Sequence, residues 1–218
     1  MYASNPCRRQ WRLPKGAWGA VVQLLSGNSG VTGRLLHHAT MPHIRFIAHE
    51  DASMNAERQL IDSGLRAWKF NADRIETFFH ALSEDQLQQE IAPGRNRLLY
   101  LWGHLAAVND GLFPLLGLGP KLHPELDAMF LANPDRTVTS VLSRSELKDV
   151  SSQINDALWS AFSGWTAAEW LRKHTAVSDE DFLREPHRNR YTVMLSRNSH
   201  MAFHYGQAIL ATPRAQSS

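Results

Sequence analysis

The sequence predicts an all-α protein, a four-helix bundle with a long connection between its second and third helices. Three observations predict this fold. Apolar residues recur at steps of three and four in four segments of about twenty residues each, which is the period of an amphipathic α-helix. Capping signatures mark the starts of several helices. No segment alternates apolar and polar residues for long enough to indicate a sheet, and four amphipathic helices bury their apolar faces most simply against one another.

The first helix is predicted over residues 55–82. Its apolar stripe consists of Ile61, Leu65, Trp68, Ala72, Ile75, Phe79 and Leu82. Ser83 and Gln86 then form an S-x-x-Q capping box, which is typical of a helix start and predicts a short helical turn. Ala92, Pro93 and Gly94 end this turn, because proline and glycine interrupt regular structure.

The second helix is predicted over residues 96–113, and its stripe contains a histidine. The stripe residues are Leu101, His104, Leu105, Val108 and Leu112. Pro114 is expected to stop or kink the helix because it lacks an N–H group. A connection rich in glycine and proline follows from Gly117 to about Leu142, with one short helix predicted over residues 124–131.

Ser143 and Glu146 form a second capping box, which begins the third helix. Its stripe consists of Leu147, Val150, Ile154, Leu158, Ala161 and Trp165. Cap signatures at residues 166–169 and 178–181 predict two short connecting helices. The fourth helix is predicted over residues 189–211, with Pro213 just beyond its end. Residues 54–218 are therefore expected to form one helical domain.

Residues 1–53 differ from this domain because they show no sustained helical or strand period. They hold six basic and two acidic residues, a net charge of +4, whereas residues 54–218 hold 17 basic and 19 acidic residues, a net charge of −2. Three interpretations are open: a secretory signal with its apolar run at residues 17–25, an organelle presequence, or a non-native extension upstream of a true start at Met54. We favour the third, because helix chemistry begins directly after Met54. In each case we expect the segment to be poorly ordered.

Composition argues against several classes of protein. A single cysteine, Cys7, excludes an intramolecular disulfide and a cysteine-based metal cluster, and it fits a cytoplasmic location. No run of about eighteen apolar residues is present, so we expect no membrane span. The slightly acidic charge of residues 54–218 gives no electrostatic basis for nucleic-acid binding.

Three histidines are candidate metal ligands. His200 and His204 are four residues apart, so they project from one face of the fourth helix on neighbouring turns. His104 lies in the apolar stripe near the midpoint of the second helix, and in a bundle the midpoints of helices can meet. The alternatives are a solvated surface pair and a buried histidine with an ordinary hydrogen-bond partner. Three neutral imidazoles converging in a core are costly without a ligand, which favours a metal ion.

Three further residues are weaker candidates for the same site. Arg197 and Gln207 share the helix face of His200 and His204, where Arg197 would orient an anionic substrate and Gln207 would hold a ligand imidazole. The competing interpretation is that Arg197 reaches solvent and Gln207 bonds a neighbouring helix. Trp102 would line a pocket or pack at a dimer interface. We identify no general base, since Asp110 points off the stripe of His104, and the catalytic residues are unknown.

Two segments resemble the DinB-like family of metal-binding four-helix bundles. They are residues 97–118 (RLLYLWGHLAAVNDGLFPLLGL) and 199–210 (SHMAFHYGQAIL). The resemblance covers Met54 to about Ala211. It implies a metal triad made by one histidine of the second helix and an H-x3-H pair of the fourth, which here are His104, His200 and His204. Residues 206–207, a Gly-Gln pair, also match the family pattern.

The resemblance further implies a divalent ion, zinc or nickel, a homodimer, and kinship with transferases and isomerases that use low-molecular-weight thiols. Three nitrogen ligands leave at least one position of the ion open, as in catalytic rather than structural sites. We therefore expect a metal-dependent transferase that acts on a small-molecule substrate with a thiol. The alternative is a non-catalytic, stress-related dimer that binds the ion.

Overall fold

The structure is a computed structural model that describes the backbone of residues 43–139 and 142–211, and side chains from residue 56 onward. Nine α-helices and two isolated β-bridges make up the regular structure of these residues, and no strand is present among them. The predicted all-α class is confirmed. Within this part of the chain no helix is both long enough and apolar enough to cross a membrane.

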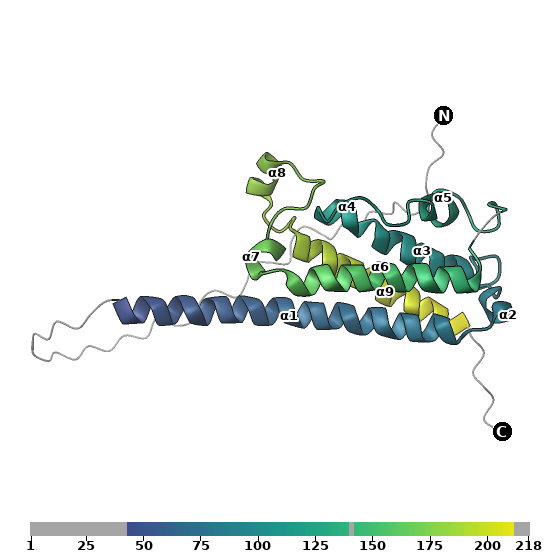
Figure 1. The fold of residues 1–218 in the computed structure, drawn as a ribbon, viewed down its shortest axis with the longest axis horizontal. Helices are drawn as coiled ribbons and strands as arrows, with labels where there is room; N and C mark the ends of the chain where they lie inside the picture. Colours follow the sequence, from purple (N-terminus) through teal and green to yellow (C-terminus); the bar gives the residue numbers. More distant parts are fainter. Residues whose placement is uncertain (1–42, 140–141, 212–218) are drawn as a thin grey trace, which may run out of the picture. The chain divides into compact units, whose positions relative to one another are not determined.

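Four long helices form the framework: α1 (His43–Ala81), α3 (Leu98–Asp110), α6 (Arg144–Gly164) and α9 (Arg190–Ala211). They run alongside one another (Figure 1), with α1 packed against α6 and α9 and with α3 packed against the same two helices. The five short helices are α2 (Glu84–Leu87), α4 (Leu112–Leu116), α5 (Leu126–Phe130), α7 (Ala167–Trp170) and α8 (Asp179–Arg184).

The seven apolar stripe residues predicted for the first helix are all buried. Aromatic rings anchor this stripe, since Trp68 meets Phe162 of α6 at a centroid distance of 5.0 Å and Phe79 stacks on Trp102 of α3 at 5.5 Å. The helix begins at His43 rather than at residue 55. The stripe marks only the part of a helix that packs against others, so it could not reveal the earlier start. The predictions for residues 1–42 lie outside the described residues.

The capping signatures are confirmed. The hydroxyls of Ser83, Ser143 and Thr166 each accept a hydrogen bond from the backbone N–H three residues later, and the Gln or Glu at that position bonds back to the N–H of the cap. Ser178 likewise accepts from the N–H of Asp181. These bonds satisfy N–H groups that have no partner within the helix, which fixes where α2, α6, α7 and α8 begin.

The second predicted helix is broken at Gly111 and not at Pro114. Gly111 caps α3, and the chain continues into α4, where Pro114 is the third residue. Proline removes the hydrogen bond to the carbonyl four residues earlier, here that of Asp110, so a break at Gly111 is where Pro114 would cause it. The expectation that Pro114 stops or kinks the helix agrees with this break, although α4 continues past the proline to Leu116.

The connection from α3 to α6 is fastened to the framework by two acidic side chains. The fully buried carboxylate of Asp110 accepts hydrogen bonds from the N–H groups of Leu122, at 2.9 Å, and of His123, at 3.0 Å. Asp135 pairs with Arg97, with Nη2 2.6 Å from Oδ1. Burial alone would raise the pKa of Asp135, but its hydrogen bonds to Arg97 lower it. The connection is thus held down at both ends of α3.

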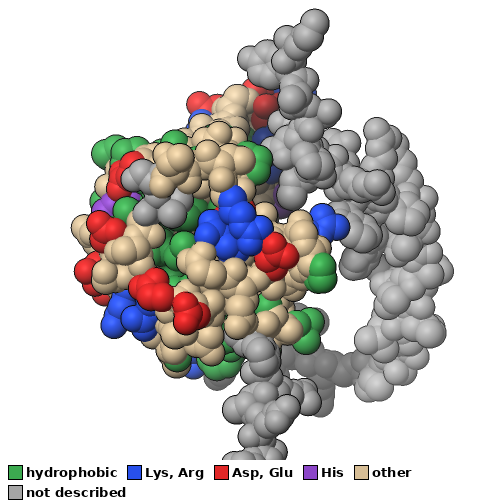
Figure 2. All heavy atoms as spheres, turned by 90° about the vertical axis from the view of Figure 1, so that its right-hand side faces the viewer, with side chains coloured by type: hydrophobic (Ala, Val, Ile, Leu, Met, Phe, Trp, Pro, Cys, Tyr) green, Lys and Arg blue, Asp and Glu red, His purple; other side chains and the backbone are tan. Residues whose placement is uncertain are grey.

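The end of the framework that holds the pair of Arg97 and Asp135 carries a second ion pair, between Arg136 and Glu90. Figure 2 looks onto this end, and there basic side chains lie next to acidic ones among apolar and uncharged groups. On this face of the described residues, the charges therefore neutralise one another locally.

Candidate metal centre

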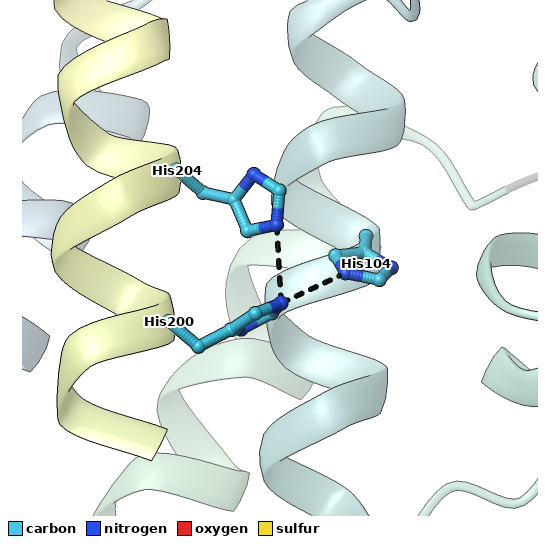
Figure 3. Close-up of side chains that lie close together, drawn as sticks. All are labelled: His104, His200 and His204. Atoms are coloured by element: carbon cyan, nitrogen blue, oxygen red, sulfur yellow. Dashed lines mark hydrogen bonds between the residues drawn. The ribbon is translucent and has the colours of Figure 1, made fainter. Parts of the chain in front are cut away.

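The three predicted histidines come together between α3 and α9. His200 and His204 project from neighbouring turns of α9, and His104 faces them from α3 (Figure 3). The Nε2 atom of His200 lies 3.3 Å from Nε2 of His104 and 3.1 Å from Nε2 of His204. One nitrogen of each ring lies within 4.8 Å of the others.

Two hydrogen bonds determine which nitrogen of the ring faces the centre. The Nδ1 atom of His104 lies 3.2 Å from the carbonyl oxygen of Phe130, and Nδ1 of His204 lies 2.7 Å from Oε1 of Gln207. Both oxygens only accept hydrogen bonds, so each Nδ1 must carry the proton. The lone pairs of the two Nε2 atoms are therefore free, and both point toward His200.

His200 cannot satisfy both of these lone pairs. A proton on its Nε2 can be donated to only one of the two facing nitrogens, and its own Nδ1 is buried without a hydrogen-bond partner. A cation among the three Nε2 atoms removes this conflict, because it accepts all three lone pairs at once. Nitrogens ~2.0–2.1 Å from a tetrahedral ion lie about 3.3 Å apart, which agrees with the observed separations. The residues thus fit a divalent ion.

Burial keeps the three imidazoles neutral. It lowers the pKa of His200 to about 3, with further contributions from His204, His104 and Arg197. Burial also lowers the pKa of His104, as do the charges of His204 and Arg197. For His204 the effect of burial exceeds the opposing effect of its hydrogen bond to Gln207. Neutral imidazole is the form that binds metal ions, so the ligands need no deprotonation near neutral pH.

The weaker candidates separate into two groups. Gln207 accepts a hydrogen bond from His204, whereas Arg197 lies one turn before His200 on α9 and contributes to lowering the pKa of His104 and His200. Trp102 points elsewhere, because it is 1% exposed and stacks on Phe79. With residues such as Glu76, Asn109 and Met201 it lines a small cavity of about 10 Å³ that none of the three histidines lines. This volume is enough for about one water molecule.

Sequence reasoning missed two groups that position His104. The carbonyl of Phe130 is a backbone acceptor, for which no residue type is a signal. Gly103 permits its approach, since a Cβ atom at this position would lie 2.4 Å from the ring of Phe130. The only available signal was a glycine beside a candidate ligand in the middle of a helix, where glycine is unfavourable without a packing reason.

Comparisons with known proteins give no family assignment: no protein-family model matches the chain, and no curated protein matches it significantly. Any function assigned to this chain therefore depends on the geometry of the three histidines.

Proposed function

We propose that the chain is a four-helix bundle of the DinB-like kind, with a long connection between its second and third helices, that binds one divalent ion, zinc or nickel, through His104, His200 and His204. A single observation carries this proposal. Three Nε2 atoms converge, and two of them are oriented by hydrogen bonds to the opposite nitrogen of the ring. Metal-binding histidines in proteins are characteristically oriented in this way.

The proposed activity is that of a metal-dependent transferase acting on a small-molecule substrate with a low-molecular-weight thiol. Three nitrogen ligands leave at least one position of the ion open. An ion held there lowers the pKa of bound water or keeps a bound thiol as the thiolate. The protein's contribution is to hold three neutral ligands in place and to partly shield the ion from water. The resemblance to thiol-dependent transferases supports the choice of thiol over water.

A second candidate function is that of a non-catalytic, stress-related homodimer that binds the ion. Two observations favour it. Among the described residues the cluster of metal-ligating side chains consists of the three histidines and contains no carboxylate, so it offers no acidic general base. Phe203 and Leu210 expose large apolar side chains on α9, and the ring of Phe203 contacts His204. Such side chains suit the interface of a dimer.

Elemental analysis of the purified protein tests the metal site. We expect about one transition-metal ion per chain in the wild type and its loss in His104→Ala and His204→Ala, because two remaining ligands bind far more weakly. His187→Ala is the matched control, since His187 is an exposed histidine that makes no contribution to the triad. Equal metal content in all four proteins would show that the triad is not a metal site.

Addition of thiols to the cobalt-loaded protein separates the two candidate functions. Thiolate coordination produces a new absorption band in the visible or near-ultraviolet spectrum. A response to a cellular thiol supports the transferase, whereas metal binding without any thiol response supports the non-catalytic protein.

A further inference from the structure

Arg197 is a half-buried cation without a partner, next to the three histidines. It lies three residues before His200 on α9, and therefore on the same face of this helix, one turn away. Its Nε atom is buried without a hydrogen bond, its Nη atoms are not fully buried, and no ion pair joins its guanidinium to a described carboxylate. Burial lowers its pKa. A buried donor normally has an acceptor, so the unpaired Nε atom of Arg197 is an exception that a bound ligand would remove.

Other partly buried arginines of the same structure contact a carboxylate, an aromatic ring or a carbonyl, although the Nε atoms of Arg74 and Arg190 are also buried without a hydrogen bond. Arg97 is paired with Asp135. Arg74 lies over the ring of Tyr205 with its Cζ atom 4.4 Å from the centroid, and Arg190 lies over Trp165 at 4.6 Å. Arg144 donates to the backbone carbonyls of Leu82 and His80. Among the described residues, Arg197 has neither a carboxylate nor an aromatic face nor a carbonyl.

The charge of Arg197 acts directly on the candidate metal centre. It contributes to lowering the pKa of both His104 and His200. A divalent ion would add two more positive charges, and the ligands that hold it are neutral. No described carboxylate shifts the pKa of the three histidines or of Arg197. The loaded site would thus carry about three positive charges with no anion from the protein near them.

We propose that Arg197 binds an oxyanion, a carboxylate in the simplest case, on the same small molecule that occupies the open position of the metal ion. This inference rests on the proposed function and extends it by naming the charge of the ligand. The helix rises about 4.5 Å over three residues, and a helical side chain leans toward the N-terminus of its helix. From this geometry we expect the guanidinium beyond His200, on the side away from His204, and a ligand with its anionic group a few bonds from its metal-binding atom would span the distance between the ion and Arg197.

The experiment compares small thiols that differ in charge. Cobalt-loaded protein is titrated with 3-mercaptopropionate, which is anionic, 2-mercaptoethanol, which is neutral, and cysteamine, which is cationic. We expect 3-mercaptopropionate to bind about tenfold more tightly than 2-mercaptoethanol, with cysteamine weakest, because a charge-assisted hydrogen bond favours the anion. In Arg197→Gln the preference for the anion should fall to about twofold or less, while the affinity for 2-mercaptoethanol stays within about twofold of the wild type.

Two variants control for general effects. Arg66→Gln removes the same charge from an exposed position of α1 and should leave the preference unchanged. Arg197→Lys keeps the charge but loses the planar fork, so it should retain part of the preference. If Arg197→Gln does not fold, Arg197→Met, which keeps the length of the side chain without its charge, takes its place, and an unchanged preference in that variant would overturn the proposal.

The outcomes distinguish this inference from the proposed function. Failure to bind cobalt overturns both. Cobalt binding with equal affinity for the three thiols, or a preference for the anion that persists in Arg197→Gln, overturns the inference and leaves the metal site standing. If cobalt binds and no thiol does, the thiol-dependent activity is wrong. The same comparison is then made with acetohydroxamate and succinohydroxamate, which bind metal ions without a thiol, and equal affinities for these two would overturn the role of Arg197.

Discussion

At the scale of single residues, the hydrogen bonds to Nδ1 decide what the site can bind. The Gln207 side chain and the Phe130 carbonyl each accept a proton from an imidazole and leave Nε2 free. The Nδ1 atom of His200 has no such partner. Gln207 thus fixes one of the two ligands of α9, and a change at this position acts on metal binding without removing a ligand.

Gln207→Leu is expected to weaken metal binding about 10–100-fold, which is the usual cost of losing a group that orients a ligand histidine. Gln207→Glu keeps an acceptor at the same place and should retain most of the affinity. Competition with a chromophoric chelator measures both constants. An unchanged affinity in Gln207→Leu would mean that His204 is held by helix packing alone.

At the scale of elements, the position of α5 against α3 depends on a glycine. Gly103 is buried, and the ring of Phe130 occupies the space in which a Cβ atom would lie. The carbonyl of Phe130 accepts a hydrogen bond from His104. A change in the packing of α5 against α3 would therefore also change the orientation of this candidate metal ligand. The connection between α3 and α6 is therefore part of the site, although it supplies no ligand.

Gly103→Ala is expected to destabilise the protein by about 1–3 kcal/mol, since the added methyl group overlaps a buried ring. It should also weaken metal binding, because Phe130 must move away from α3 and take its carbonyl with it. Chemical denaturation and chelator competition measure the two effects. The matched control is Gly206→Ala on α9, where a Cβ atom meets nothing within 4 Å. This control should be neutral or stabilising by up to about 1 kcal/mol, and equal losses in both variants would contradict the role assigned to Gly103.

At the scale of the whole molecule, the stability of the metal-free protein should depend on pH through the three histidines. Their pKa values in the folded protein lie below the value of about 6.5 expected in the unfolded chain. Between pH 6.5 and the folded pKa of about 3 for His200, the unfolded chain thus binds more protons than the folded one, and stability falls as the pH falls.

We expect the triad to contribute a loss of about 1–2 kcal/mol between pH 7 and pH 5, a figure reduced for the partial exposure of its side chains. Urea denaturation at the two pH values measures it. His200→Gln should show a smaller loss than the wild type. His80 and His174 have lowered pKa values and His123 a raised one. Their contributions to the pH dependence of stability are the same in the wild type and in His200→Gln. Equal losses of stability in these two proteins would therefore contradict the contribution of His200.

Much of this arrangement is predictable from the sequence because it depends on local periods. The stripe of α1, the capping boxes and the four-residue spacing of His200 and His204 are properties of neighbouring residues. Contacts between distant segments are not. The sequence did not show that Trp102 faces the core, or that Trp165 lies only partly buried against Trp170 at the end of α6. Whether such a side chain is buried depends on the residues that face it from other helices, and the apolar period within one helix does not reveal those residues.

The placement of the ligands also bears on how the chain comes apart. His104 and His200 are 96 residues apart in the sequence. An ion bound to both would close a loop of that length, as a disulfide does, and a crosslink of this span removes conformational entropy from the unfolded chain worth about 4–5 kcal/mol. A disulfide persists until it is reduced, whereas this crosslink would open whenever the ion leaves. The detachment of α9 from α3 would then be governed by the concentration of free metal ion around the protein, and the lifetime of the folded chain would become a readout of metal supply.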